Sequence, residues 1–253
     1  MPEAGLETAA DGAAAARSAA PPVAPSFLRQ VARIAAKDLR IEWRSREIIF
    51  TMTFLAVVVV LIFSFAFVVG DARPPAPVTS GILWVALVVS GTVGLGRTFD
   101  RERDGEAIRS LLLSPTSRAA IYVGKLAATV ALMLLVEVVL TFLAGLLFSS
   151  MVATQLRPVA TLLVLGTIGF SAVGCVFSAA LLRARSRDVL LSTLLYPIIV
   201  PIVIAGARGT AQLIDPISPD FDAARFWTQF LVAVDIVFIT VGLWAFEPVV
   251  TGE

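Results

Sequence analysis

The sequence predicts an all-α integral membrane protein with six transmembrane helices, and three observations support this. Of its 253 residues, 58% are hydrophobic and only 15% are charged, against about 25% charged in soluble domains. Six stretches carry about 20 mostly apolar residues, which is the length of a helix that crosses the hydrocarbon core. The run VVVVLIFSFAFVV shows no alternation of polar and apolar residues, so helices are favoured over barrel strands.

The predicted permease domain occupies residues 48–246. Its spans are expected at about 48–70, 78–96, 126–148, 159–182, 189–206 and 226–246. Residues 1–26 are rich in Ala and Pro and offer little bulk to bury, which predicts a disordered tail. Residues 247–253 are expected to form a second tail.

The basic residues predict the orientation of these spans. Lys and Arg concentrate before the first span, between the second and third, and between the fourth and fifth. Because basic loops remain in the cytoplasm, both termini are expected there.

Residues 27–47 (FLRQVARIAAKDLRIEWRSRE) have helical periodicity. One face carries Arg29, Arg33, Lys37, Arg40 and Arg44, and the other Leu28, Val31, Ala35, Leu39 and Trp43. This pattern predicts a helix along the membrane interface, with its basic face among anionic lipids. An ordinary basic stretch beside the first span is the alternative. Asp38 and Glu42 interrupt the apolar side, and we expect them to pair with Arg33 or Arg46.

The loop between the second and third spans mixes acidic and basic residues and then turns apolar. Ile108, Leu111 and Leu112 have the spacing of one helical ridge, and Ser114-Pro115 ends it. An exposed ridge of this kind favours docking into a groove on another protein. The alternative is a solvated loop whose leucines fold back onto the bundle.

Two carboxylates fall in the middle of predicted spans, Glu137 in the third and Asp235 in the sixth. An unpaired carboxylate at that depth costs several kcal/mol. They are interpreted as a polar face for transport or for contact with a partner subunit. The alternative is a protonated carboxyl bonded to Thr, Ser or Tyr of a neighbouring helix. Lys125, the nearest lysine, is expected to extend to the cytoplasmic surface.

Other features concern shape. Pro197 and Pro201 should kink the fifth span, either as part of a gate or as static shape. Small residues in the second and fourth spans favour close helix packing, with Cys175 as a small filler. Residues 207–229 are expected to hold a short outer helix capped near Ser218 or Asp220.

Two stretches resemble a known family. WVALVVSGTVGLGRTFDRERDGEAIRSLLLSPTSRAAIYVGK (84–125) and KDLRIEWRSRE (37–47) are similar to the B-type permease subunit of the cytochrome c maturation system, the CcmB family. The wider class of ABC-2 (type V) exporters commonly carries a similar motif in its first cytoplasmic loop. It consists of Glu-Arg with a Gly shortly after it, followed further along by Leu-Leu-x-[Ser/Thr]-Pro-x-[Ser/Thr]-Arg. The matching residues here are Glu102, Arg103, Gly105, Leu111, Leu112, Ser114, Pro115, Ser117 and Arg118.

The resemblance implies that residues 100–113 are a coupling helix that docks on a cytoplasmic ATPase. Ile108, Leu111 and Leu112 would pack against it, and Arg101, Glu102 and Arg103 would set its register, with Gly105 in the same motif. The chain has no phosphate-binding loop, because Gly124-Lys125 lacks the upstream Gly and the following Ser or Thr. ATP would therefore act through a partner, and this chain would not be an enzyme.

The resemblance also implies an inner-membrane complex for c-type cytochrome biogenesis, with haem as the suspected cargo. Its expected partners are an ABC ATPase (CcmA-like, in two copies), a haem-handling membrane subunit (CcmC-like) and a small single-span subunit (CcmD-like). The sequence contains no His, so no cofactor or metal is expected on this chain, and no nucleic acid as a partner. The alternatives are a generic ABC-2 permease for a lipid, glycan or drug, and a non-transporting scaffold that recruits a cytoplasmic protein.

Overall fold

The computed structural model describes residues 26–67, 74–97, 117–148, 150–181 and 187–251, and it confirms the all-α fold within these ranges. The elements are α2 (Phe27–Ser45), α3 (Glu47–Phe67), α4 (Ala76–Arg97), α7 (Arg118–Leu147), α8 (Ser150–Thr154), α9 (Leu156–Ala180), α10 (Arg187–Ile214) and α11 (Phe221–Thr251). Within the described residues, six helices are long and apolar enough to cross a membrane. The chain is therefore a multi-pass membrane protein.

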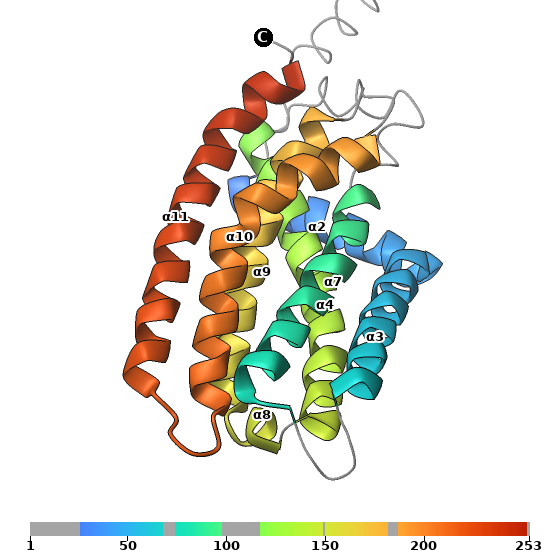
Figure 1. The fold of residues 1–253 in the computed structure, drawn as a ribbon. Coiled ribbons are helices and arrows are strands. Elements are labelled where there is room, and N and C mark those ends of the chain that lie inside the picture. Colours follow the sequence, from blue (N-terminus) through green and yellow to red (C-terminus); the bar gives the residue numbers. More distant parts are fainter. Residues whose placement is uncertain (1–25, 68–73, 98–116, 149, 182–186, 252–253) are drawn as a thin grey trace, which may run out of the picture.

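Helix α9 is the central element of the bundle. It packs against α4, α7, α10 and α11, while α3 lies on the outside against α4 and α7 (Figure 1). Its buried face is built from small residues such as Gly166, Ser171 and Gly174, which lets neighbouring backbones approach closely. The small-residue pattern in the sequence predicted this close packing.

The ends of the helices sort to two sides of the bundle. The C-termini of α4, α9 and α11 and the N-termini of α7 and α10 lie at one end, uppermost in Figure 1. The opposite end holds α8 and the turn between α10 and α11. This arrangement is the one that the basic residues predicted, and the assignment of the upper end to the cytoplasm stays a prediction.

Several helices are longer than the apolar runs that predicted them. Helix α7 already begins at Arg118, where the Ser117 hydroxyl accepts from the N–H of Ala120 at 3.2 Å. Helix α10 continues to Ile214, and α11 continues through Thr251 into the predicted tail. Hydropathy marks only the part of a helix that lies in lipid, whereas caps and polar flanks extend it.

The short outer helix expected within residues 207–229 does not form. Asp220 instead caps α11, because its side chain accepts from the N–H of Ala223 at 2.9 Å. Before it, Asp215 accepts from the N–H groups of Ile217 and Ser218 at 2.9 and 3.2 Å, and these bonds lower the pKa of its carboxyl. Both acids therefore stabilise the connection between α10 and α11, and residues 215–220 form no separate helix.

Helix α10 is bent. Pro197 and Pro201 both lie inside it, and Figure 1 shows its first part crossing the bundle before the rest descends. Each proline lacks an N–H donor and its ring displaces the preceding turn, which explains the change of direction. Whether this bend also acts as a gate stays a prediction.

Candidate functional site

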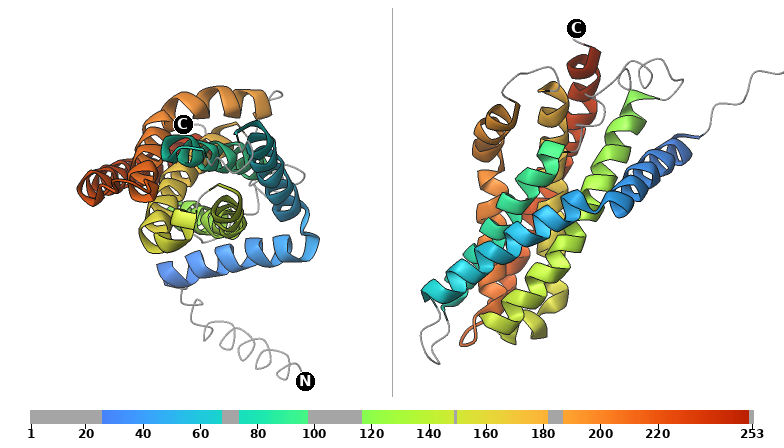
Figure 2. Two further views of the ribbon diagram at one scale, coloured as in Figure 1. Left: turned by 60° about the horizontal axis from the view of Figure 1, so that its bottom comes forward. Right: turned by 90° about the vertical axis from the view of Figure 1, so that its right-hand side faces the viewer.

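Helix α2 lies along one edge of the bundle and crosses α7, as the left view of Figure 2 shows. Gly124 of α7 makes this close contact possible, because a methyl carbon there would lie 2.8 Å from Cβ of Ile34. The predicted basic residues Arg33, Lys37, Arg40 and Arg44 are all exposed, and so is Trp43. The basic face and the Trp43 side chain thus remain available outside the bundle, whereas Val31, Ala35 and Leu39 of the predicted apolar face are half-buried.

The acidic residues of α2 do not pair as the sequence suggested. Asp38 forms ion pairs with Lys125 of α7 at 3.2 Å and with Lys37 at 3.1 Å. The expected pairing with Arg33 or Arg46 was therefore wrong, because the helical turn directs Asp38 toward α7. Lys125 is also buried, so it does not extend to the surface as expected.

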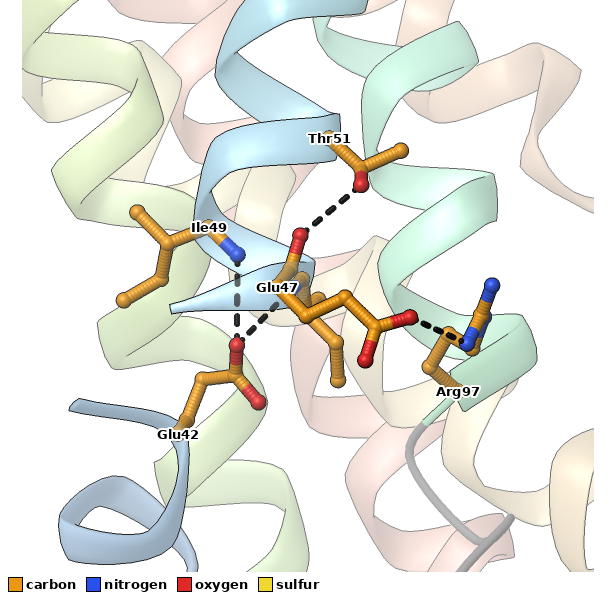
Figure 3. Close-up of polar contacts among 6 residues, drawn as sticks. Glu42, Glu47, Ile49, Thr51 and Arg97 are labelled. Atoms are coloured by element: carbon orange, nitrogen blue, oxygen red, sulfur yellow. Dashed lines mark hydrogen bonds and ion pairs between the residues drawn. The ribbon is translucent and has the colours of Figure 1, made fainter. Parts of the chain in front are cut away.

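Glu42 joins α2 to α3. Its carboxylate accepts from the N–H of Ile48 at 2.7 Å and from that of Ile49 at 3.3 Å, so it caps the first turn of α3 (Figure 3). Arg46, between the helices, has a φ of 58° and donates its N–H to the Glu42 carbonyl at 2.6 Å. Arg46, in the left-handed conformation, ends α2, and the Glu42 carboxylate caps the start of α3. Together they fix a sharp turn between the two helices, which we call the elbow.

We expect Glu42→Ala to destabilise the protein by about 1–2 kcal/mol, because two N–H groups lose their acceptor. Glu42→Gln keeps a side-chain oxygen at the same place, so its loss should be smaller. Thermal unfolding of both variants in one detergent measures the difference. Equal losses would show that the charge of Glu42, and not its acceptor, stabilises the elbow.

The two stems of the loop 98–116 are attached to other helices. Arg97, at the end of α4, pairs with Glu47 of α3 at 3.0 Å (Figure 3). At the other stem, Arg118 pairs with Glu247 of α11 at 2.7 Å, and the N–H of Ser117 donates to Gln30 of α2 at 3.1 Å. The residues predicted to dock on an ATPase lie outside the described residues: Arg101, Glu102, Arg103, Gly105, Ile108, Leu111 and Leu112.

The two intramembrane carboxylates occupy different environments. Glu137 accepts a hydrogen bond from the hydroxyl of Thr167 on α9, which is the kind of partner that the alternative interpretation predicted. Asp235 of α11 is 5% exposed, and neither of its carboxylate oxygens has a hydrogen-bond partner within the described residues. It packs against Gly169 of α9, where a methyl carbon would lie 2.4 Å from Oδ1. The two acids therefore have different surroundings, and their role in transport or in contact with a partner subunit stays a prediction.

A groove of about 720 Å³ lies between α7, α8 and α9, and we call it the α7–α9 groove. Its lining is apolar except for Glu137 and Thr141. Both acids are 5% exposed, but Glu137 lines the groove, whereas neither carboxylate oxygen of Asp235 reaches a surface within the described residues. The sequence predicted the acid but neither α8 nor the groove.

Comparison with known proteins assigns this architecture to a family. The family model described as "CcmB protein" matches residues 29–251, which cover α2 from its third residue, all the later described helices and the segment 98–116. The chain belongs to the CcmB family. The resemblance inferred from the two sequence stretches is thereby confirmed.

One curated relative from Haemophilus influenzae carries the name "Heme exporter protein B". It is 30% identical to this CcmB-family chain over 173 residues, which cover 68% of the chain and 76% of the relative. The first 28 residues lie outside the CcmB family match. The match therefore takes in nearly all of α2 and the segment 98–116, and leaves out the Ala- and Pro-rich segment.

Proposed function

We propose that this chain is the permease subunit of an ATP-driven membrane complex for c-type cytochrome biogenesis. The complex would export haem or release a haem-loaded chaperone on the outer side of the inner membrane. The CcmB family match over residues 29–251, together with the similarity to a relative named as a haem exporter protein, is the observation that supports this proposal. Haem is the cargo, and the absence of His from the sequence argues against haem ligation through an imidazole of this chain.

Coupling to ATP hydrolysis would occur through the loop 98–116. Its stems are held by ion pairs to the first and last spans, so a force on the loop would reach α3 and α11 directly. The chain carries no phosphate-binding loop, so a cytoplasmic ABC ATPase would supply the hydrolysis. A haem-handling membrane subunit and a small single-span subunit would complete the assembly. Both termini would lie in the cytoplasm, and the exposed basic face of α2 would lie among anionic lipid headgroups.

Deletion of the chain from its host should abolish covalent haem staining of c-type cytochromes. In the complemented strain, Leu111→Glu should reduce both the staining and the co-purified ATPase by at least about tenfold, because it places a charge in the packing ridge. Thr116→Glu adds the same charge outside the docking element and should leave both close to wild type. Normal staining in the deletion strain would refute the proposal. Co-purification of an ATPase alone would instead indicate a generic exporter.

The side of the membrane can be tested with a cysteine at position 104. The native Cys175 is fully buried, so it should contribute little background to labelling by an impermeant reagent. We expect Asp104→Cys to be labelled only after the membrane is opened. Labelling from outside intact cells would place the loop where no ATPase reaches it.

A further inference from the structure

We propose that the α7–α9 groove is the docking site for a transmembrane helix of a partner subunit, which donates a hydrogen bond to Glu137. The inference rests on the proposed function, because it requires a second membrane subunit in the complex. It goes further in naming the surface, the chemistry of the occupant and the residue that the occupant contacts.

The shape of the groove suits a helix. Its lining extends along α7 from Leu134 to Leu146, which corresponds to about 18 Å at the rise of an α-helix. Val138, Phe142 and Leu146 are exposed and follow one another at every fourth residue, so they form a ridge along one side. Ridges of this spacing are the surfaces that pack between the side chains of a second helix.

Small residues border the groove on all three helices. Gly145 of α7, Ala153 of α8 and Ala160 of α9 line it. A methyl carbon added to Gly145 would lie 3.9 Å from the backbone N of Ala153, in ordinary van der Waals contact, so α7 and α8 approach closely at this edge of the groove. Lipid chains are as apolar as the helices, so the hydrophobic effect does not drive helices together in the membrane. Helices associate there through close van der Waals packing, which small residues make possible.

The carboxyl group of Glu137 distinguishes a protein helix from a lipid chain. Within the described part of the chain, Thr167 is its hydrogen-bond partner, which leaves the second oxygen without one. Both oxygens of Asp235 are buried from any surface, whereas Glu137 lines the groove. An acyl chain carries no donor, so it would leave a polar oxygen against hydrocarbon. A partner helix with a Ser, Thr, Asn, Gln or Trp side chain at this depth would supply the donor.

A second copy of the chain fits the groove less well. A twofold contact through this surface would bring the same patch against itself, and therefore groove against groove and Glu137 toward Glu137. Two facing carboxyl groups repel when charged, and a carboxylate has no hydrogen to donate to the other. A different subunit with a donor has the complementary chemistry.

Photo-crosslinking in the purified complex tests the inference directly. A photoreactive amino acid at Phe142 should crosslink to a transmembrane segment of another membrane subunit, identified by mass spectrometry. The same group at Ile236, which is exposed on α11, is the control and should not crosslink to that segment. Crosslinks at Phe142 only to lipid, only to a second copy, or to nothing would overturn the inference.

Variants of the groove give a second measurement. Ala160→Trp should reduce the co-purified membrane partner by about tenfold and Glu137→Leu by about threefold, while the ATPase is retained. Glu137→Gln keeps the shape and an acceptor, so it should retain the partner, and Ile236→Trp controls for added bulk. A complex that contains a membrane partner unaffected by these variants overturns the inference and leaves the proposed function standing. A preparation that matures cytochromes without any other membrane subunit also overturns the inference alone, whereas normal haem staining in the deletion strain overturns both.

Discussion

Gly206→Ala is expected to destabilise the protein by about 3 kcal/mol, because the core has no room for one methyl group. The added carbon would lie 2.1 Å from Cζ2 of Trp84. Gly166 of α9 contacts the same indole, and a methyl carbon there would lie 2.2 Å from its Cη2. Its Nε1 donates to Thr210 at 3.1 Å, so the ring has no direction in which to move. Thermal unfolding in detergent measures the loss.

Gly81→Ala is the matched control. This residue also lies in a transmembrane helix, but a methyl carbon there meets nothing within 4 Å. The change should therefore be neutral or stabilise by up to about 1 kcal/mol, since Ala favours helix over Gly. If both variants unfolded at the same temperature, Trp84 would not be clamped between α9 and α10.

A second-site change separates crowding from other effects of Gly206→Ala. Trp84→Phe removes the outer ring atoms that the new methyl group would contact, although it also removes the donor to Thr210. The double variant should consequently be more stable than the sum of the two single losses predicts. Strict additivity would contradict the proposed steric contact.

The sequence was sufficient to predict the spans because one physical quantity dominates them. A helix in lipid needs about 20 apolar residues whatever it packs against, so composition alone locates it. Small residues in α9 likewise predicted close packing. The sequence did not show that Trp84 packs against Gly166 and Gly206, because these three residues lie far apart along the chain and only the fold brings them together. The predicted spans for α7, α10 and α11 were shorter than the helices themselves, because polar residues that continue a helix beyond the lipid resemble loop residues in the sequence.

The candidate site was predictable in residue type but not in pairing. Asp38, Lys125 and Glu42 all carry charge near a predicted membrane boundary, where a solvated residue and a buried pair have the same sequence signature. Only the crossing of α2 over α7 brings Asp38 to Lys125, and that crossing depends on Gly124. Glu137 and Asp235 looked equivalent for the same reason, although one faces a groove and the other is enclosed.

Lys125→Met is expected to release α2 from the bundle and to cost about 3 kcal/mol, as breaking a buried ion pair from one side does. The Lys125 side chain is 3% exposed and that of Asp38 is 18% exposed, so water replaces the lost partner poorly. Lys37 still contacts Asp38, but this lysine is 52% exposed, and Lys37→Met should cost no more than about 1 kcal/mol. Comparison of the two methionine variants by thermal unfolding thus isolates the buried contact from the exposed one.

The pair should matter for function because α2 and α7 meet just beyond the loop that would receive the ATPase. Detachment of α2 should increase trypsin cleavage at its basic residues and reduce covalent haem staining in the same variant. Replacing both partners, as in Lys125→Met with Asp38→Leu, leaves no unpaired charge and should restore much of the stability. Restored stability without restored haem staining would mean that the ion pair transmits motion as well as holding the helix. If Lys125→Met were as mild as Lys37→Met in both assays, α2 would be held against α7 by the packing at Gly124 and not by the ion pair.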